Sequence, residues 1–203
     1  NLKIVSSVGP SGHDGIHTVN SNHVTIQDSF IHSDDDNIGI SGMWNSATPV
    51  DTVSVSRCVF WANASNVSPS VPETPFNYGR WNSNGQVFAV VYTQSTGQIY
   101  VSTRGGGVSY NSDATPDGYF DNQWHHVAVV HSPSSSFTKI YVDGILKVTD
   151  NTPPVTNTIL QNSRLGSRSD GNTWAFNGSV DNLILWNRTL NDAEVNYLFQ
   201  NGL

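Results

Sequence analysis

Two short segments decide the fold of this chain: QWHHVAVV at residues 123–130 and KIYVDG at residues 139–144. Val127 and Val129, and again Ile140 and Val142, stand at alternate positions that turn toward one face of a strand, and β-branched and aromatic residues dominate both segments. The dipeptide Asp143-Gly144 favours a two-residue turn, and the alternating pattern resumes at residues 145–149. The sequence therefore predicts an antiparallel hairpin with further strands packed beside it.

The rest of the C-terminal half has the same alternating texture, interrupted by Gly, Pro, Asn and Asp. The predicted strands are residues 86–93, 97–103, 124–131, 138–142, 145–149 and 179–186. The side chains expected in the core are Trp124, Val127, Val129, Ile140, Val142, Ile145, Val148, Val180, Leu183 and Leu185. Only residues 190–203 are expected to be helical, because Asn191 can cap the segment and Glu194 stands at the capping-box position.

Four blocks in this order carry a resemblance to a known family: residues 123–130, 139–144, 165–168 and 176–190. The series resembles the laminin-G-like, concanavalin A-like jelly roll over about residues 85–203. The resemblance implies an all-β fold, a concanavalin A-like jelly-roll sandwich, and a role in binding rather than catalysis. In similar domains the acid at the place of Asp181 often helps to hold a structural Ca²⁺, which wants six to eight oxygen ligands. The alternative for Asp181 is that it caps the turn into a strand.

The segment at residues 1–66 differs from the rest of the chain in the spacing of its apolar residues. LKI at residues 2–4 is followed by VTI at residues 24–26 and by VSV at residues 53–55. Such steps are about the length of one coil of a parallel β-helix, although evenly spaced antiparallel strands explain them equally well. Three prolines in residues 67–75 predict a stiff, extended linker or crossing segment. The predicted organisation is a β-helix-like or extra-strand segment at 1–66, a Pro-rich linker at 67–75 and a jelly roll at 76–203.

HDGIH at residues 13–17 and HSDDD at residues 32–36 resemble the right-handed β-helix glycoside hydrolases, of the polygalacturonase or dextranase/isopullulanase type. Asp35 and Asp36 follow Asp14 at about the length of one coil, and one coil moves a side chain by only about 4.8 Å. Clustered carboxylates raise one another's pKa, so that one acts as general acid and the others as general base. The resemblance thus implies an inverting glycoside hydrolase that acts on O-glycosyl bonds.

Several features depart from that hydrolase pattern. The Gly-His-Gly and Arg-x-Lys motifs of pectinases are absent, and the segment at 1–66 makes at most about three coils. An Asp-Asp-Asp-Asn run is also typical of a solvated turn. A further alternative is that residues 1–66 are the first strands of one jelly roll that spans the whole chain.

Composition narrows the range of partners. The 203 residues carry nine Lys and Arg against sixteen Asp and Glu, a formal charge of −7. This balance argues against nucleic acid and against an anionic membrane surface. No apolar run approaches the length of a transmembrane helix and Cys58 is the only cysteine, so neither a membrane span nor a disulfide within the chain is expected. His125 and His126 are expected to be structural, and the composition suits a secreted protein.

Exposed aromatic side chains can stack on the apolar face of a sugar ring. Four aromatic residues lie in or beside loop-like stretches, and the candidate ligand-binding residues are Trp81, Tyr110, Tyr119 and Trp174. Three functions follow from the sequence. They are a carbohydrate-binding module for polysaccharide or oligosaccharide, an inverting glycoside hydrolase using Asp14, Asp35 and Asp36, and a non-catalytic adhesion or structural module. Cofactors other than calcium are not expected.

Overall fold

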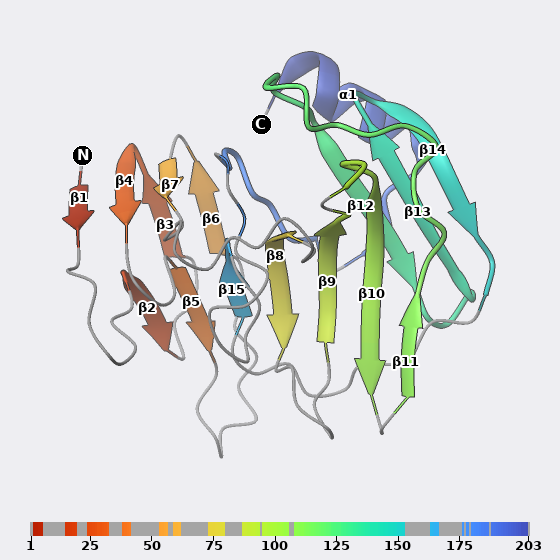
Figure 1. Ribbon diagram of the computed structural model, residues 1–203, viewed down its shortest axis with the longest axis horizontal. Coiled ribbons are helices and arrows are strands. Elements are labelled where there is room, and N and C mark those ends of the chain that lie inside the picture. The colour runs from red at the N-terminus through yellow and green to blue at the C-terminus, as the bar shows by residue number, and fades with distance from the viewer. Residues whose placement is uncertain are drawn as a thin grey trace.

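A computed structural model gives the architecture of the chain. The structure describes residues 2–5, 15–19, 24–32, 38–41, 53–56, 59–61, 73–79, 87–93, 95–105, 108–152, 163–166, 176, 178, 180–186 and 188–202. Within these residues the protein is built of strands and one C-terminal helix, so the predicted all-β class is confirmed (Figure 1).

One long sheet of seven strands runs the length of the molecule (Figure 1). Its order is β11 (Val108–Asn111), β10 (Ile99–Gly105), β9 (Val87–Tyr92), β8 (Glu73–Gly79), β15 (Ser163–Leu165), β5 (Ile38–Ser41) and β2 (Ile16–Val19). Strands β8 to β11 pair antiparallel in chain order. Strand β15, from late in the chain, lies between β8 and β5, and its Leu165 pairs with both Phe76 and Ile38.

A second sheet covers one end of the long sheet. It is formed by the antiparallel strands β12 (Val127–Ser132), β13 (Phe137–Val142) and β14 (Ile145–Asp150). The predicted hairpin turn joins β13 to β14, with Asp143 at φ 52° and Gly144 at φ 73°. Two adjacent left-handed residues give the tight turn whose twist matches that of the paired strands, and Asp and Gly tolerate them best.

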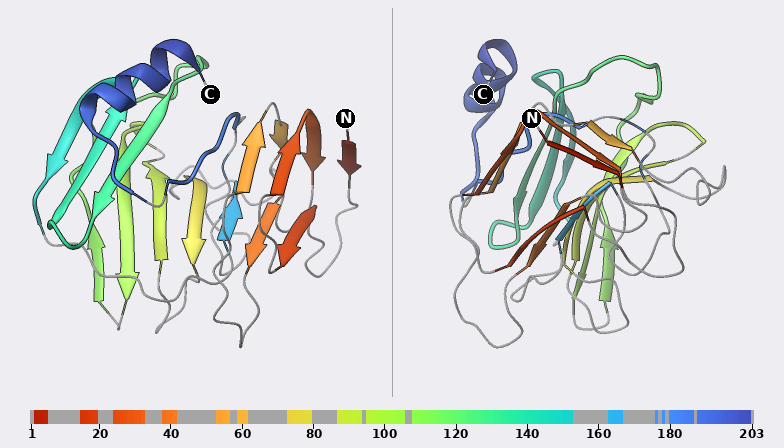
Figure 2. Two further views of the ribbon diagram at one scale, coloured as in Figure 1. Left: turned by 180° about the vertical axis from the view of Figure 1, so that it is seen from behind. Right: turned by 90° about the vertical axis from the view of Figure 1, so that its left-hand side faces the viewer.

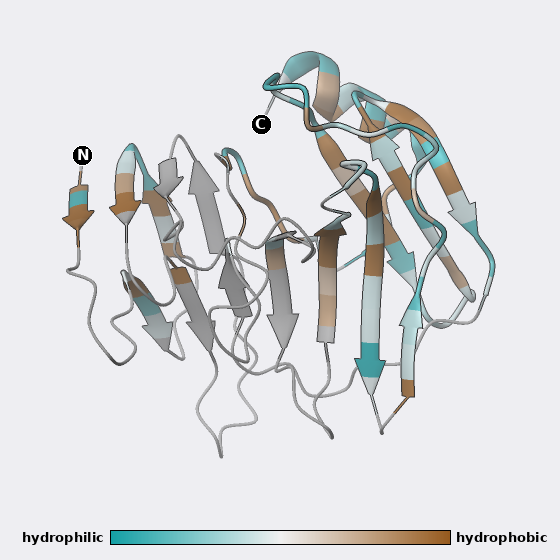
Figure 3. Cartoon of the chain, viewed as in Figure 1, coloured by the Kyte–Doolittle hydropathy of each residue, from teal (hydrophilic) through white to brown (hydrophobic). Residues whose placement is uncertain are grey.

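The alternation of side chains in β12 and β13 builds two cores, one on each face of the second sheet. The inner faces contribute Val129, Ile140 and Val142, which pack against Ile99 and Val101 of the long sheet. The outer faces contribute Val130 and Tyr141, which pack against Val195 of the helix α1. Figure 3 shows the hydropathy of the residues along the strands of this sheet. A sheet that is covered on both faces needs apolar residues at odd and at even positions along its strands, and this sequence has them.

Helix α1 (Asp192–Asn201) lies on the outer face of the second sheet (Figure 2). Its capping box is the predicted one: the Asn191 side chain accepts from the Glu194 N–H at 2.9 Å, and the Glu194 carboxylate accepts from the Asn191 N–H at 2.8 Å. The helix also bonds to the sheet beneath it, because the Tyr141 hydroxyl donates to Asp192 at 2.7 Å.

Replacing the helix cap tests how much α1 contributes to stability. Asn191→Ala removes the acceptor for the Glu194 N–H, and we expect the free energy of unfolding to fall by about 1 kcal/mol. Urea denaturation followed by circular dichroism measures it. The control is Gln200→Ala, an exposed position in the same helix, where we expect a change within about 0.5 kcal/mol. Equal effects of the two variants would show that the cap contributes nothing.

The N-terminal strands stack in parallel, in three ladders. These strands are β1 (Leu2–Val5) with β4 (Ser29–His32) and β7 (Val59–Trp61), β3 (Val24–Gln27) with β6 (Val53–Ser56), and β2 with β5. Val24 pairs with Val53 on the neighbouring parallel strand, so the predicted step from residue 24 to residue 53 is one turn of a parallel ladder. The first predicted step, from Leu2 to Val24, is wrong because Leu2 pairs with Ser29, but a step of the same length joins Ile16 to Ile38.

This parallel segment and the jelly roll share one core. Ile26, Ile31 and Ile38 are buried with Phe76 of β8, and Val180 and Leu183 pack against them. Strand β5 also hydrogen-bonds to β15, so the long sheet contains strands from both predicted segments. The division at residues 66 and 76 stays a prediction.

Three sequence expectations are corrected by the structure. Within residues 180–186, only Leu183 forms an isolated bridge, so the strand predicted at 179–186 is absent from the described part, and Leu185 is 40% exposed. Glu73 to Pro75 belong to β8 rather than to a linker. The register shifts there, and such a bulge tolerates a proline because the ladder does not need an N–H from that position. The Pro75 carbonyl accepts from the Gly166 N–H. Trp124 and Ile145, both expected in the core, are 68% and 60% exposed.

Candidate functional site

A long loop at residues 112–126 lies at the end of the sandwich where β9 joins β10. It follows β10 as an irregular edge: the N–H groups of Ser112, Thr115 and Tyr119 donate to the carbonyls of Val101, Ile99 and Gly97, at 2.9, 2.8 and 3.0 Å. The Thr115 hydroxyl also accepts from the Ile99 N–H at 2.9 Å. The backbone of the 112–126 loop is therefore fixed to the long sheet along one side.

Side chains tighten the contact between this loop and the β9–β10 turn. The Gln98 amide donates to the Thr115 carbonyl at 2.7 Å. Gly118 lies directly against the backbone of Thr96, and a Cβ at Gly118 would overlap the Thr96 carbonyl oxygen. Gly97, at φ 67°, faces Phe120 in the same way, with the Phe120 nitrogen 2.9 Å from the position of a Cβ. Glycine is required at both places because of this close approach.

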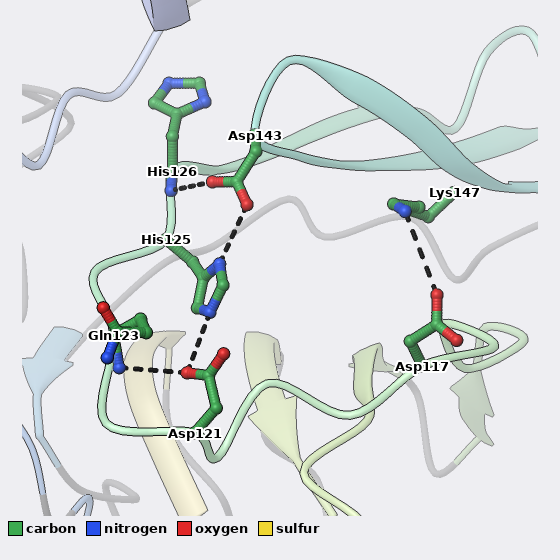
Figure 4. A network of polar contacts seen from close by, with 7 residues as sticks. All are labelled: Asp117, Asp121, Gln123, His125, His126, Asp143 and Lys147. Atoms are coloured by element: carbon green, nitrogen blue, oxygen red, sulfur yellow. Dashed lines mark hydrogen bonds and ion pairs between the residues drawn. The ribbon is translucent and has the colours of Figure 1, made fainter.

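The other side of the loop is held by a histidine between two carboxylates (Figure 4). His125 Nδ1 lies 2.8 Å from Asp143 Oδ2, and His125 Nε2 lies 3.1 Å from Asp121 Oδ1. Asp143 Oδ1 accepts from the His126 N–H at 2.9 Å, and the Asp143 N–H donates to the His126 carbonyl at 2.8 Å. The 112–126 loop is thus fixed to the β13–β14 hairpin as well, and His125 has the structural role expected of it.

The hydrogen bonds of this network favour the charged forms of His125 and Asp121. Burial opposes protonation of His125, but the bonds to Asp143 and Asp121 outweigh burial and raise the pKa of His125 above its ordinary value. The Gln123 N–H, which donates to Asp121 Oδ1 at 2.9 Å, and the His125 ring lower the pKa of Asp121. The two hydrogen bonds therefore stabilise the protonated form of His125 relative to a histidine without such partners.

Aromatic rings fill the space under the loop. Phe120 stacks on Tyr92 with ring centroids 5.3 Å apart and an interplanar angle of 8°, and Tyr119 meets His125 edge-on at 5.1 Å. Burial, together with Asp143 and Tyr119, raises the pKa of Tyr92 to about 12. These contacts leave an apolar base beneath the loop and fix the plane of the His125 ring.

Two aromatic side chains of the loop face solvent. Trp124 is 68% exposed and Phe120 is 44% exposed. Between them, Asn122 adopts φ 61° in a turn closed by the Asp121 carboxylate, a conformation that Asn tolerates. Large aromatics on a pre-shaped loop are the usual means of binding a partially apolar ligand with little loss of conformational entropy.

Sequence reasoning missed this pair. Trp124 was expected in the core together with Val127 and Val129, on a strand beginning at residue 124. The strand begins only at Val127, after the Asp121 turn, so Trp124 belongs to the loop. The available signal was Asp121-Asn122, a pair that favours a turn.

The structure describes only some of the residues that the sequence predicts to bind sugar or to act in catalysis. Asp14, Asp35, Asp36, Trp81 and Trp174 lie outside the described residues. Their roles stay predictions.

Tyr110 and Tyr119 are described, and the structure brings them to different places. Both are half-buried, and both hydroxyls are buried without a hydrogen-bond partner of good geometry. Burial and the neighbouring carboxylate of Asp150 raise the pKa of Tyr110. Tyr119 lies in the 112–126 loop against His125, so it stands next to the exposed pair, whereas Tyr110 pairs with Thr103 towards the end of β10. Their roles in sugar binding stay predictions.

Asp181 is exposed, and its carboxylate accepts from the Asn182 N–H at 2.8 Å, with Asn182 at φ 52°. This contact fits the turn-capping alternative for Asp181. Within the part of the chain that the structure describes, no three His, Cys, Asp or Glu side chains converge as metal ligands. Calcium binding at Asp181 stays a prediction that needs further oxygen ligands.

Comparison with known proteins identifies the family. Residues 44–196 match the concanavalin A-like lectin/glucanases superfamily, so this chain belongs to that superfamily, and the predicted laminin-G-like resemblance is confirmed. The resemblance to β-helix glycoside hydrolases is not supported by this match.

Individual relatives are distant in sequence. The chain is similar to the Ruminococcus gnavus IT-sialidase CBM40 bound to α2,3-sialyllactose, with 18% identity and a TM-score of 0.55 over 66% of this chain and 77% of that one. It is also similar to domain 4 of an extracellular arabinanase from Geobacillus stearothermophilus, in complex with arabinotriose, with 23% identity and a TM-score of 0.50 over 63% and 59% of the two chains. These likenesses show the fold.

A curated relative is the human adhesion G-protein coupled receptor D1, which is 27% identical over 148 residues. The match covers 71% of this chain but only 16% of the receptor, so the chain spans a small part of that protein. Among the described residues, no helix is both long and apolar enough to cross a membrane.

Proposed function

We propose that this protein is an extracellular carbohydrate-binding module that binds oligosaccharide through the 112–126 loop. The observation that carries the proposal is the exposure of Trp124 and Phe120 on a loop that is hydrogen-bonded to both sheets. Aromatic rings supply the stacking surface, and the neighbouring carboxylates and the Asn122 amide supply partners for sugar hydroxyls. A sialidase module with sialyllactose and an arabinanase domain with arabinotriose share the fold, which supports sugar binding in general terms.

The charges around the loop favour an uncharged glycan. Residues 112–126 include Asp113, Asp117 and Asp121 but no Lys or Arg. Lys147, a cation on the neighbouring strand β14, is already placed 3.9 Å from Asp117. A sugar carboxylate would approach three aspartates, and the one cationic group of the loop, the protonated His125, already lies between Asp121 and Asp143, so the approach costs free energy at low salt.

A panel of oligosaccharides tests the proposed function. Isothermal titration of the protein with neutral oligomers of arabinose, xylose, galactose and glucose, and with oligogalacturonate and α2,3-sialyllactose, is expected to give binding to at least one neutral oligomer. We expect any acidic member to bind at least tenfold more weakly than the best neutral one at low salt. Binding to none of the panel, neutral or acidic, would remove the proposal.

A hydrolytic role for Asp14, Asp35 and Asp36 is a separate proposal. What supports it is the parallel register of β2 and β5, in which Ile16 pairs with Ile38, because a step of the same length separates Asp14 from Asp36 in the sequence. Release of reducing ends from dextran, pullulan or polygalacturonate, and its loss in Asp36→Asn, is the measurement that decides it.

A further inference from the structure

His125 connects the 112–126 loop to the second sheet through both of its ring nitrogens. Its partners come from different elements: Asp121 from the loop itself at 3.1 Å and Asp143 from the β13–β14 turn at 2.8 Å. The side chain is 16% exposed, so the ring is shielded but solvent can still exchange its proton. Trp124 is its immediate neighbour in the chain, and Phe120 precedes Asp121 by one residue.

The geometry needs two donors on the imidazole. A carboxylate offers only acceptors, and a neutral imidazole has one N–H and one lone pair. When His125 is neutral, one of its nitrogens therefore faces a carboxylate oxygen without a proton between them. One charge-assisted bond is then lost and the other weakened, and the loop keeps its backbone bonds to β10 but not its full attachment to the hairpin.

When His125 is neutral, the other titratable groups around its ring do not supply the missing proton to the carboxylates. Tyr119 contacts the ring edge-on, and its hydroxyl has no hydrogen-bond partner among the residues that the structure describes. Tyr92, on β9 beneath the loop, keeps its proton because its pKa is raised to about 12. His126 turns its ring towards Phe199 of α1, at 5.8 Å, and burial lowers the pKa of His126. His125 is therefore the group whose charge changes near neutral pH between these carboxylates.

We propose that His125 is a positioning residue: its doubly protonated ring holds the Trp124 side of the 112–126 loop in its binding conformation, so the affinity for glycan falls as the solution becomes alkaline. This inference rests on the proposed function of the loop. The sign follows from linkage. The ordered loop binds the His125 proton more tightly than the loosened loop, so order and affinity are complete at low pH and are lost as the pH rises through the His125 pKa.

The test is the dissociation constant of the best neutral oligomer of the panel from pH 5 to pH 9, together with the imidazole NMR titration of His125. We expect the dissociation constant of the wild-type protein to rise at least fivefold across the titration of His125, with the same midpoint in both measurements. His125→Gln is expected to bind more weakly at pH 5 and to show a flat profile. His131→Gln, which alters a histidine on β12 that contacts Phe88 and Thr138, is the control and is expected to keep the wild-type profile.

A second variant keeps the inference open to refutation if His125→Gln folds poorly. In Asp121→Asn the side-chain oxygen can still accept from the Gln123 N–H and from His125 Nε2, but it no longer carries a carboxylate charge. The bond lost on deprotonation of His125 is then a weaker, neutral one, so the loss of affinity at high pH is expected to shrink at least twofold. Binding that is strong but independent of pH in the wild-type protein would overturn the inference and leave the proposed function standing. Absence of binding at every pH would remove both.

Discussion

Truncating Trp124 is expected to abolish most of the glycan affinity while leaving the fold intact. Trp124→Ala removes the largest exposed aromatic surface of the 112–126 loop, and we expect the dissociation constant to rise at least about 30-fold, or about 2 kcal/mol. Because the side chain is 68% exposed, the free energy of unfolding is expected to change by no more than about 0.5 kcal/mol. Titration calorimetry and urea denaturation measure the two quantities.

The matched control is a second exposed tryptophan outside the loop. Trp186 is 48% exposed, and the Arg188 guanidinium lies 5.5 Å from its ring centroid. Trp186→Ala is expected to leave the dissociation constant unchanged within twofold. If Trp186→Ala weakens binding and Trp124→Ala does not, the glycan binds elsewhere on the molecule and the 112–126 loop is not the site.

Adding one methyl group at Gly118 is expected to have the largest effect on the loop itself. The Cβ of Gly118→Ala would overlap the Thr96 carbonyl oxygen, and backbone cannot move aside as a flexible side chain can. The loop must then separate from the β9–β10 turn and lose the bond from the Tyr119 N–H to the Gly97 carbonyl. We expect a loss of about 2 kcal/mol or more of stability, or about 5 °C in Tm, and weaker glycan binding.

Scanning calorimetry of Gly118→Ala beside Asp117→Ala separates the clash from the charge. Asp117 is exposed and 3.9 Å from Lys147, a surface pair that contributes little. We expect Asp117→Ala to retain the wild-type Tm within about 2 °C. A Gly118→Ala protein with wild-type stability would mean that the loop does not lie against Thr96 in solution.

The sequence predicted the local parts of this fold well because their signals are short-range. Asp143-Gly144 determines a turn by its own backbone preferences, and Asn191 with Glu194 determines a helix start within a single turn. The strand predicted at residues 179–186 is the counter-example. Its apolar pattern is real, but a strand also needs a partner beside it, and only Leu183 has a bridge in the described segment.

The site was harder to predict than the fold. His125, Asp121 and Asp143 meet through an arrangement of loop and hairpin that no spacing in the sequence encodes. Trp124 looked like a core residue because it is large and close to a strand, and the turn at Asp121 places it outside. Tyr119 was selected for being in a loop, and it does lie in the 112–126 loop, but its ring is half-buried against His125.

The position of β15 has a consequence for how the chain folds. Leu165 pairs with Phe76 on one side and with Ile38 on the other, so the long sheet stays in two separate pieces until a strand from late in the chain is available. Pairings between residues so distant in sequence make folding slow, because a large loop must close before any contact compensates for the lost entropy. During synthesis on the ribosome, β5 therefore lacks its β15 partner until residues 163–165 have emerged, and the seven-stranded sheet cannot be completed before that point.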